Sequence, residues 1–398
     1  MKKTVQKLLY ALHSSRPSLS FQVRFWDGET MRLGEGEPAF VLLLKTEKAV
    51  KRVFASGTLG FGEEYMAGNI DVEGNFAELM YLGTRPEFEN LDFSLGTKLS
   101  IFIQYLKTLN TLVRSPHNIS HHYDRGNDFY RLWLDDSMTY SSAYFRSESD
   151  TLEQAQQQKY EHICRKLQLQ KGETLVDIGC GWGGMLIYAA KHYGVSGVGC
   201  TLSEPQVQYA RQRIKREGLE DSIKILKEDY RKMEGNFDKF ISIGMYEHVG
   251  KKFLPTFMAK TRSLLKPGGI GVLHYIGKEK KTAGDPWTLK YIFPGGYIPL
   301  LGETVEAMGK AGLVPIDIEN LRLHYAMTLD EWSRRYEANV EKIREMFDES
   351  FVRMWRMFLN GSAAGFRYGN TRLYQIIFTN GLNNDLPLTR EHVYKKVK

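Results

Sequence analysis

The chain of 398 residues contains little cysteine and no long apolar run. Its three cysteines, Cys164, Cys180 and Cys200, are odd in number and lack C-x-x-C spacing, so the sequence indicates neither a disulfide framework nor a zinc site. The longest apolar run, around residues 39–44, is far shorter than the roughly 18 residues of a membrane-spanning helix. These absences favour a protein of the reducing cytoplasm that would touch lipid only from outside.

The charge of the chain is mixed, with a modest basic excess. Fifty-four Lys and Arg residues against 47 acidic ones give a net charge of +7, which suits a polyanionic partner. The sequence has no Lys/Arg block and no recognised nucleic-acid module, so we expect an anionic membrane surface and no nucleic acid. The chain starts with two adjacent lysines, Lys2 and Lys3, ahead of a brief apolar stretch at 8–12 without a cleavage-site pattern, which predicts an amphipathic helix rather than a signal peptide.

The length of the chain predicts two domains. Strand-like segments at 21–26 and 39–44, separated by turns, indicate a small α+β domain, which the glycines between Gly57 and Gly68 would close as turns or present as an interface. We place an N-terminal α+β domain for lipid or membrane docking at residues 1–95, a linker helix at 96–114 and a second domain at 115–398.

The start of the second domain is rich in histidine, which raises the question of a metal. His117, His121 and His122 lie in a polar run. They form no pair on a helix with a carboxylate partner, as a zincin-type site would require. We therefore predict no metal site.

The centre of the chain is a buried strand that runs into a glycine-rich turn. The apolar run 174–178 is followed by Gly179, Gly181 and Gly184, which permit positive φ and close backbone approach before a helix at 185–193. The same glycines fit the dinucleotide motif G-x-G-x-x-G, but the tip of the next strand, 199–201, lacks the acidic residue of a nicotinamide site. Asp177 precedes the glycines, where its carboxylate would balance a cationic ligand, so a sulfonium fits better than a pyrophosphate.

Strands and helices alternate on both sides of this turn. We expect a helix at 152–167, strands at 195–199, 223–226, 237–244 and 270–274, helices at 204–217 and 253–265, and a turn at 266–269. One or two amphipathic helices within 328–358, either packed in a core or facing lipid, would precede a last strand at 373–378. This alternation predicts a doubly wound, mainly parallel α/β sheet with its ligand at the carboxyl ends of the strands.

Polar residues follow these strands in the sequence. Residues 201–206 follow the second strand, 229–231 the third, Glu247 the fourth, and His274 ends the fifth. A lone carboxylate there could be a helix cap, and a lone histidine is usually a satisfied core residue. Together at one rim of the sheet, Glu247 and His274 favour a functional site.

At this point the sequence resembles a known family. The runs His-Tyr-Asp-Arg-Gly-Asn-Asp at 122–128, Tyr-Ser-Ser-Ala-Tyr at 140–144, Val-Asp-Ile-Gly-Cys-Gly-Trp-Gly at 176–183, Gly-Met-Tyr-Glu-His-Val-Gly at 244–250 and Leu-His-Tyr-Ile-Gly at 273–277 are similar to those of cyclopropane fatty acid synthases. Residues 59–68 resemble the extra N-terminal domain of the longer bacterial members, which the mycolic-acid members lack. The resemblance implies a class I S-adenosylmethionine-dependent methyltransferase fold, Rossmann-like, in a cytoplasmic enzyme held peripherally at the inner face of the cytoplasmic membrane, and often in a homodimer.

The resemblance also implies the chemistry. The cis double bond of an unsaturated phospholipid acyl chain attacks the methyl group of S-adenosylmethionine, and the resulting carbocation loses a proton to close a cyclopropane ring. A bound bicarbonate serves as base, held by the side chains of Glu247, His274 and Tyr325 and by the backbone N–H groups of Ser142 and Ile276. Ser142 stands where most members have cysteine, which makes a thiol nucleophile impossible at this position.

The resemblance places a larger set of residues around the methyl donor. These are Tyr140, Ser141, Asp177, Gly179, Gly181, Trp182, Thr201, Gln206, Asp229, Tyr230 and Arg231. Two rival functions stay open: a methyltransferase acting on a polar N, O or S acceptor of a small hydrophobic substrate, and a lipid-binding protein with an inactive donor site. The sequence leaves double-bond position, chain length and headgroup open.

Overall fold

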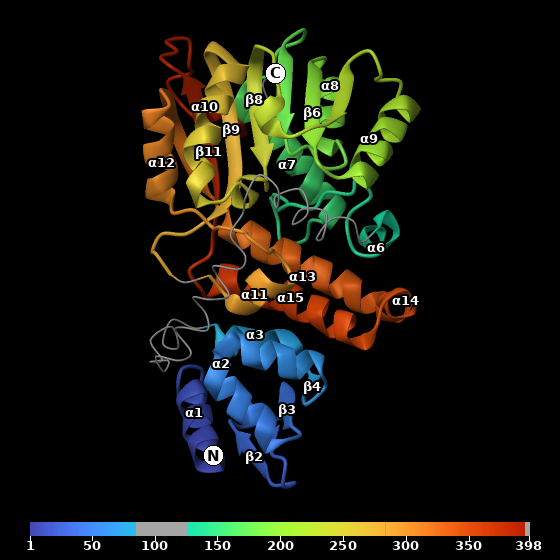
Figure 1. Cartoon of the computed structure of the whole chain (residues 1–398), viewed down its shortest axis with the longest axis vertical. Coiled ribbons are helices and arrows are strands. Elements are labelled where there is room, and N and C mark those ends of the chain that lie inside the picture. The colour runs from blue at the N-terminus through green and yellow to red at the C-terminus, as the bar shows by residue number, and fades with distance from the viewer. Residues whose placement is uncertain (85–125, 283, 395–398) are drawn as a thin grey trace. The chain divides into compact units, whose positions relative to one another are not determined.

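The computed structural model describes residues 1–84, 126–282 and 284–394 (Figure 1). The described residues form two compact units, each built from separate stretches of the chain. The first contains residues 1–84, 284–294 and 332–370, and the second contains 126–282, 295–331 and 371–394. Stretches that the sequence assigned to the second domain therefore belong to the first unit. The predicted linker helix and both predicted boundaries lie outside the described residues and stay predictions.

The first unit is built around a four-stranded sheet with the order β2-β1-β3-β4. Its strands are β1 (Phe21–Arg24), β2 (Thr30–Leu33), β3 (Phe40–Leu44) and β4 (Ile70–Gly74). Helices α1 (Lys2–Ser14), α2 (Glu47–Met66) and α3 (Phe76–Gly83) share a core with this sheet, in which Val5 of α1 and Val50 of α2 are buried with Val23 of β1. The predicted N-terminal helix and the small α+β domain are confirmed.

The prediction of turns between Gly57 and Gly68 is wrong for most of this stretch and correct only at its end, where Gly68 lies in a turn after α2 with a φ of 75°. Helix α2 runs through Met66, with one non-helical residue at Gly57, where φ is 56°. Gly62 lies against Trp287 of helix α11 (Pro286–Tyr291), and a Cβ at this glycine would come within 2.3 Å of the indole. Gly62 therefore serves close packing, which sequence patterns do not distinguish from a turn.

The amphipathic region predicted at 328–358 forms three helices. They are α13 (Arg322–Ala338), α14 (Val340–Met346) and α15 (Glu349–Arg367). Helix α15 buries ten of its residues, among them Trp355 and Leu359, and its Arg353 pairs with Asp71 of the first unit at 3.1 Å. These contacts support the core-packing interpretation for α15. No helix among the described residues is long and apolar enough to cross a bilayer.

The second unit contains a seven-stranded sheet with the order β10-β11-β9-β8-β5-β6-β7. The strands are β5 (Thr174–Ile178), β6 (Ser196–Thr201), β7 (Ile223–Lys227), β8 (Phe237–Ile243), β9 (Leu265–Gly277), β10 (Leu313–Asn320) and β11 (Arg372–Asn380). The pairs from β7 to β9 are parallel, whereas β11 pairs antiparallel with both β9 and β10. The predicted doubly wound, mainly parallel sheet is confirmed, and β10 is an addition that the sequence did not indicate.

Helices cover both faces of this sheet (Figure 1). One core lies under α7 (Leu152–Leu167), α8 (Gly184–Tyr193) and α9 (Glu204–Arg216), and the other lies under α10 (Leu254–Leu264) and α12 (Leu301–Lys310). Helix α7 begins in a capping box between Thr151 and Gln154 and ends before Gln168, whose φ is 54°. The turn predicted at 266–269 is wrong, because β9 already begins at Leu265 and takes up these residues with a shift of register against β8.

Candidate active site at the carboxyl edge of the sheet

The glycine-rich turn after β5 has the positive φ angles that its sequence predicts. Gly179 and Gly181 have φ values of 86° and 55°, which glycine adopts without steric cost. Gly183, with φ 78°, takes the third left-handed position instead of Gly184. Gly184 begins α8, and a Cβ there would lie 2.4 Å from the hydroxyl of Tyr160. The prediction for Gly184 was therefore wrong in its φ and right in its close approach.

A cavity of about 150 Å³ opens beside this turn. We call it the donor cavity. All the residues that the sequence assigned to the methyl donor line it: Tyr140, Ser141, Asp177, Gly179, Gly181, Trp182, Thr201, Gln206, Asp229, Tyr230 and Arg231. The parallel strands β5, β6 and β7 bring these segments to one edge of the sheet, as expected for a doubly wound fold. Their individual roles stay predictions.

Several polar groups of the donor cavity are paired with each other. Thr201 donates a hydrogen bond to Gln206 Oε1 at 2.7 Å, and the Trp182 indole donates to Asn127 Oδ1 at 2.8 Å. Arg231 Nε donates to Asp229 Oδ1 at 2.8 Å. Burial by itself would raise the pKa of Asp229, but the hydrogen bonds from Arg231 lower it below its ordinary value. These three hydrogen-bonded pairs hold the polar side chains of the cavity in place before a ligand binds.

Asp177 and Lys159 are both buried and both line the donor cavity. Burial raises the pKa of Asp177 and lowers that of Lys159, and each charge partly offsets the shift of the other. Asp177 Oδ1 is buried without a hydrogen-bond partner, while Lys159 donates to Ser141 Oγ at 3.0 Å. A buried carboxylate oxygen without a hydrogen-bond partner, such as Asp177 Oδ1, is suited to bind a cationic ligand.

The sequence reasoning missed Lys159. It identified only the apolar face of α7, with Tyr160, Ile163 and Leu167, all of which are indeed buried. The signal that it passed over is a second, polar stripe at steps of three, three and four residues, and every member of this stripe is also buried: Gln156, Lys159, His162 and Lys166. A helix that is buried on both an apolar and a polar face is expected next to a functional site.

A second group of polar atoms lies at the ends of β8 and β9. We call Glu247, His274 and Ile276, with Gln375 beside them, the Glu247 cluster. Glu247 belongs to the short helix η3 (Tyr246–His248), and its Oε1 accepts a hydrogen bond of 2.5 Å from the backbone N–H of Ile276. Burial raises the pKa of Glu247 to about 7. Its Oε2 is buried and has no partner.

His274 has one occupied and one unoccupied ring nitrogen. Nδ1 lies 2.9 Å from Gln375 Nε2, and Nε2 is buried without a partner. Burial lowers the pKa of His274 well below its ordinary value, and the nearby Lys159 and Lys166 lower it further, so the ring is neutral at pH 7. Two buried polar atoms without partners in one cluster, Glu247 Oε2 and His274 Nε2, are unusual in a folded core and fit a small polar ligand.

The loop with Ser142 is fastened to α13, which carries Tyr325. The Ala143 N–H donates to Thr328 Oγ1 at 3.0 Å, and the Phe145 N–H donates to His324 Nδ1 at 3.1 Å. Ser142 is fully buried, and its hydroxyl donates to the carbonyl of Ala143 at 3.0 Å. The structure thus brings Ser142 beside the first turns of α13, and it brings Glu247 to the backbone of Ile276, two residues from His274 along β9. The assignment of all five residues to one anion stays a prediction.

The described residues contain no group of three or more His, Cys, Asp and Glu side chains that could hold a metal ion. His117, His121 and His122, which raised the question of a metal in the sequence, lie outside the described residues.

Comparison with known proteins agrees with this geometry. The family model of mycolic acid cyclopropane synthetase matches residues 86–376. The chain belongs to this family. A second model, a domain of unknown function (DUF7884), matches residues 8–87. The chain is 38% identical to the cyclopropane-fatty-acyl-phospholipid synthase of Escherichia coli K12, over 87% of this chain and 90% of that protein.

Two further proteins are similar to this chain, one over nearly all of it and one over about two thirds. A protein of Pseudomonas putida named "Probable fatty acid methyltransferase" is 35% identical, over 95% of this chain and 97% of that protein. The crystal structure of the mycolic acid cyclopropane synthase CmaA1, complexed with SAH and CTAB, superposes with a TM-score of 0.63 at 31% identity, covering 66% of this chain and 98% of that one. The expected methyltransferase fold is confirmed, and relatives of this family modify lipids by more than one named reaction.

Proposed function

We propose that the protein is a cyclopropane fatty acid synthase that transfers a methylene group from S-adenosylmethionine to the cis double bond of an unsaturated phospholipid acyl chain. The observation that carries the proposal is the Glu247 cluster, with buried and unpartnered Glu247 Oε2 and His274 Nε2 next to the Ile276 N–H. A methyltransferase that needed only its donor would not require such a pair. The name of the Escherichia coli relative supports the choice of substrate.

The donor cavity would bind S-adenosylmethionine. The unpartnered Asp177 Oδ1 offers a negative partner for the sulfonium or the amino group of the donor, and the left-handed glycines allow its backbone to approach closely. An alkene is a weak nucleophile, so the protein's contribution is to hold it in line with the methyl group and to exclude water, which would trap a cation.

The Glu247 cluster would bind bicarbonate, which supplies the base for the proton lost on ring closure. His274 Nε2 and the N–H groups of Ser142 and Ile276 are donors suited to an anion, and Glu247 is an acceptor suited to the hydroxyl of the same anion. Tyr325, on the helix fastened to the Ser142 loop, would complete this set. The Ile276 N–H donates to Glu247, so Glu247 and the anion would share this donor.

The deciding experiment uses S-adenosylmethionine with a deuterated methyl group and vesicles of unsaturated phospholipid. We expect ring products that retain two of the three deuterium atoms, by mass spectrometry, at a rate that falls when bicarbonate is removed. Demonstrable donor binding without any lipid product would instead move the assignment to a polar N, O or S acceptor. Full activity without bicarbonate would be consistent with the lipid substrate but would refute bicarbonate as the base.

A second candidate is methyl transfer to the acyl chain without ring closure. The similarity to the fatty acid methyltransferase of Pseudomonas putida favours it, because that similarity extends over 95% of this chain. Without ring closure, the carbocation would lose a proton from a neighbouring chain carbon and give a branched alkene with the same hydrogen count as the ring. The same experiment separates the two reactions, because the branched alkene retains all three deuterium atoms whereas the ring product retains two. The site favours the ring, because ring closure needs a base beside the new methyl group.

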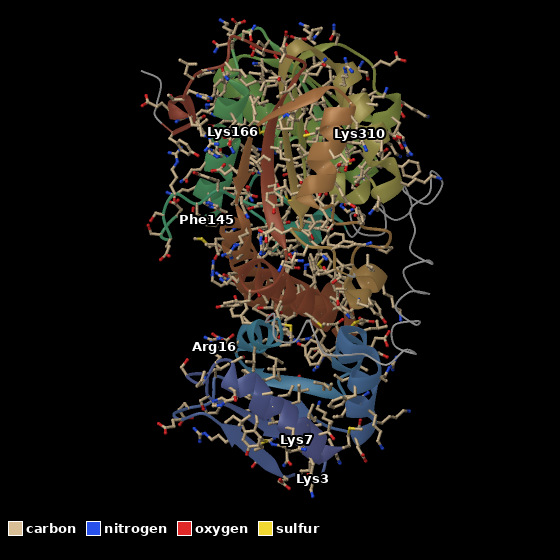
Figure 2. All side chains as sticks on the ribbon, turned by 90° about the vertical axis from the view of Figure 1, so that its left-hand side faces the viewer. Lys3, Lys7, Arg16, Phe145, Lys166 and Lys310 are labelled. Atoms are coloured by element: carbon tan, nitrogen blue, oxygen red, sulfur yellow. The ribbon has the colours of Figure 1, made fainter. Side chains whose placement is uncertain are left out.

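The substrate implies work at a membrane surface, and we propose the inner face of the cytoplasmic membrane. Lys3 and Lys7 are exposed on α1 (Figure 2), and each basic residue near an anionic surface contributes about 1 kcal/mol. Replacing both by alanine should weaken sedimentation with anionic vesicles by roughly tenfold or more at low salt. Lys310→Ala is the control, because Lys310 is exposed in the second unit and already pairs with Glu306 at 2.5 Å. Binding that neither the double variant nor salt changes would contradict membrane docking through α1.

A further inference from the structure

Three neighbouring strands of the second unit carry a row of polar residues that ends at His274. In the register of the sheet, Glu319 of β10 is opposite Gln375 of β11, and Gln375 is opposite His274 of β9. Directly opposite residues point to the same face of a sheet, so the three side chains lie side by side. Gln375 and His274 are fully buried, where a polar row must be hydrogen-bonded to be tolerated.

Helix α7 closes this row with the polar stripe described above. Lys166, labelled in Figure 2, donates to Gln375 Oε1 at 2.6 Å and also donates to Glu319 Oε2. His162 Nε2 lies 2.8 Å from the same Glu319 oxygen. Burial would raise the pKa of Glu319, but His162 and Lys166 lower it to about 2, so Glu319 is an ionised acceptor at pH 7.

These contacts determine which way the Gln375 amide is turned. A lysine ammonium only donates hydrogen bonds, so the oxygen of the amide has to face Lys166. The amide nitrogen then faces His274 Nδ1 and donates to it at 2.9 Å. A neutral imidazole that accepts at Nδ1 carries its hydrogen on Nε2. The ring nitrogen without a partner, Nε2, is therefore a hydrogen-bond donor on the side of the ring away from Gln375.

We propose that Gln375 is a positioning residue, which Lys166 and Glu319 orient so that neutral His274 is held as the tautomer with its hydrogen on Nε2. His274 would then offer the anion a donor without competing with it as a base. This inference rests on the proposed function for the identity of the anion, whereas the tautomer itself is a property of the protein alone. With the opposite tautomer, Nε2 would present a lone pair to the anion and repel it.

The first test measures the tautomer directly. The ring nitrogens of His274 are observed by 15N NMR in protein labelled with 15N-histidine, with His274→Asn used for assignment, because protonated and unprotonated ring nitrogens differ strongly in chemical shift. We expect hydrogen on Nε2 alone in the full-length protein without added bicarbonate. In Gln375→Met, which keeps the side-chain length and removes the amide, we expect a mixture of tautomers. Hydrogen on Nδ1, or on both nitrogens, in the unaltered protein at pH 7 would overturn the proposal.

The matched control is Thr379→Val on the same strand. Thr379 is as deeply buried as Gln375, and its hydroxyl donates to the carbonyl of Gly381 at 2.8 Å. The control should lose one buried hydrogen bond and keep the tautomer. Gln375→Met should raise the KM for bicarbonate about tenfold with the Kd for S-adenosylmethionine unchanged, as expected for one weakened buried hydrogen bond. Equal effects in the two variants would show a merely structural role and overturn the proposal.

Lys166→Met is the substitute if Gln375→Met does not fold. It removes the ammonium group that orients the Gln375 amide, so it should give the same mixture of His274 tautomers.

Gln375→Glu gives a separate readout through pH. A carboxylate at this position would accept a hydrogen from Nδ1, so Nε2 would carry a hydrogen only while the ring is doubly protonated. Its activity should therefore fall as pH rises through the pKa of His274, a limb that the unaltered protein lacks. The charged or titratable groups that act on the ring are Lys159, Lys166 and His162 from α7 and Glu319 from β10. All of them are common to both proteins, so an identical alkaline limb in the two would contradict the proposal. If the His274 tautomer is as expected but bicarbonate has no effect on the rate, bicarbonate is refuted as the base, whereas the positioning role of Gln375 is supported.

Discussion

The donor cavity and the Glu247 cluster lie in one unit of the protein and differ in how far along the sequence their polar partners are drawn from. In the donor cavity, Thr201 is paired with Gln206 and Asp229 with Arg231, over separations of five and two residues. In the Glu247 cluster, two buried polar atoms have no partner, and His274 is supported by Gln375, 101 residues away. These two pairs of the first site depend on local sequence, whereas the support of His274 depends on strands that pair only in the finished fold. Substitutions in the two sites should therefore fail in different ways.

The largest effect is expected from Glu247→Gln. The variant keeps the shape of the side chain but weakens the acceptor that would orient the anion. We expect kcat to fall about 100- to 1,000-fold, while the Kd for S-adenosylmethionine measured by calorimetry stays within about twofold. Activity equal to that of the unaltered protein would refute the role of Glu247.

The free energy of unfolding should depend on pH because of the Glu247 carboxyl group. Burial raises the pKa of Glu247 to about 7 from 4.5, so the folded state keeps a proton that the unfolded state releases at lower pH. The resulting stabilisation is complete below about pH 4.5 and is lost as pH rises to about 7. The free energy of unfolding of the unaltered protein, minus that of Glu247→Gln, should decrease by about 3 kcal/mol over this range. Urea unfolding of both proteins at several pH values measures it, and a constant difference would contradict the raised pKa.

The backbone of the donor cavity can be tested with two glycines of the same turn. Gly179→Ala adds a strained left-handed residue and a Cβ 2.7 Å from Met245, so we expect a loss of about 2–4 kcal/mol in the free energy of unfolding. Gly181→Ala is the matched control, because it has a left-handed φ but nothing within 4 Å of the added Cβ. Its expected loss is about 1–2 kcal/mol. Thermal unfolding ranks the two, and the reverse order would show that the contact with Met245 is unimportant.

The smallest effect is expected from Asp229→Asn, which makes the same charge change as Glu247→Gln in the other site. Loss of the carboxylate releases Arg231 and disorders the donor cavity, so the Kd for S-adenosylmethionine should rise about tenfold. At saturating donor, kcat should stay within about threefold of its original value. Glu204→Gln, an exposed acid that pairs with Lys227 at 2.9 Å, should change neither quantity. A fall in kcat without weaker donor binding would erase the distinction between the two sites.

The same contrast explains what could be predicted from the sequence. The alternation of apolar runs and helical stripes located β5 to β9 and the segments that follow them, because each signal lies within a few residues. The individual residues of the donor cavity, such as Tyr140 and Ser141, came from the resemblance to a known family. Glu247 was found because it follows a strand, and His274 because it ends the strand predicted at 270–274, which the structure extends to Gly277. Gln375, Lys166 and Glu319 were not found, since their connection depends on the register of β9, β11 and β10. The glycines of α2 were misread for the same reason, because Trp287 packs on Gly62 across a long separation in sequence.

The burial of all three cysteines has a practical consequence for measuring membrane contact. Cys164, Cys180 and Cys200 are buried in the second unit, and burial raises the pKa of each thiol, so maleimide reagents should modify them slowly at neutral pH. A single cysteine introduced at exposed Lys7 would be the reactive thiol on a background of slow ones. An environment-sensitive fluorophore attached there would report the depth to which α1 enters a lipid surface while the chemistry proceeds in an unlabelled catalytic unit.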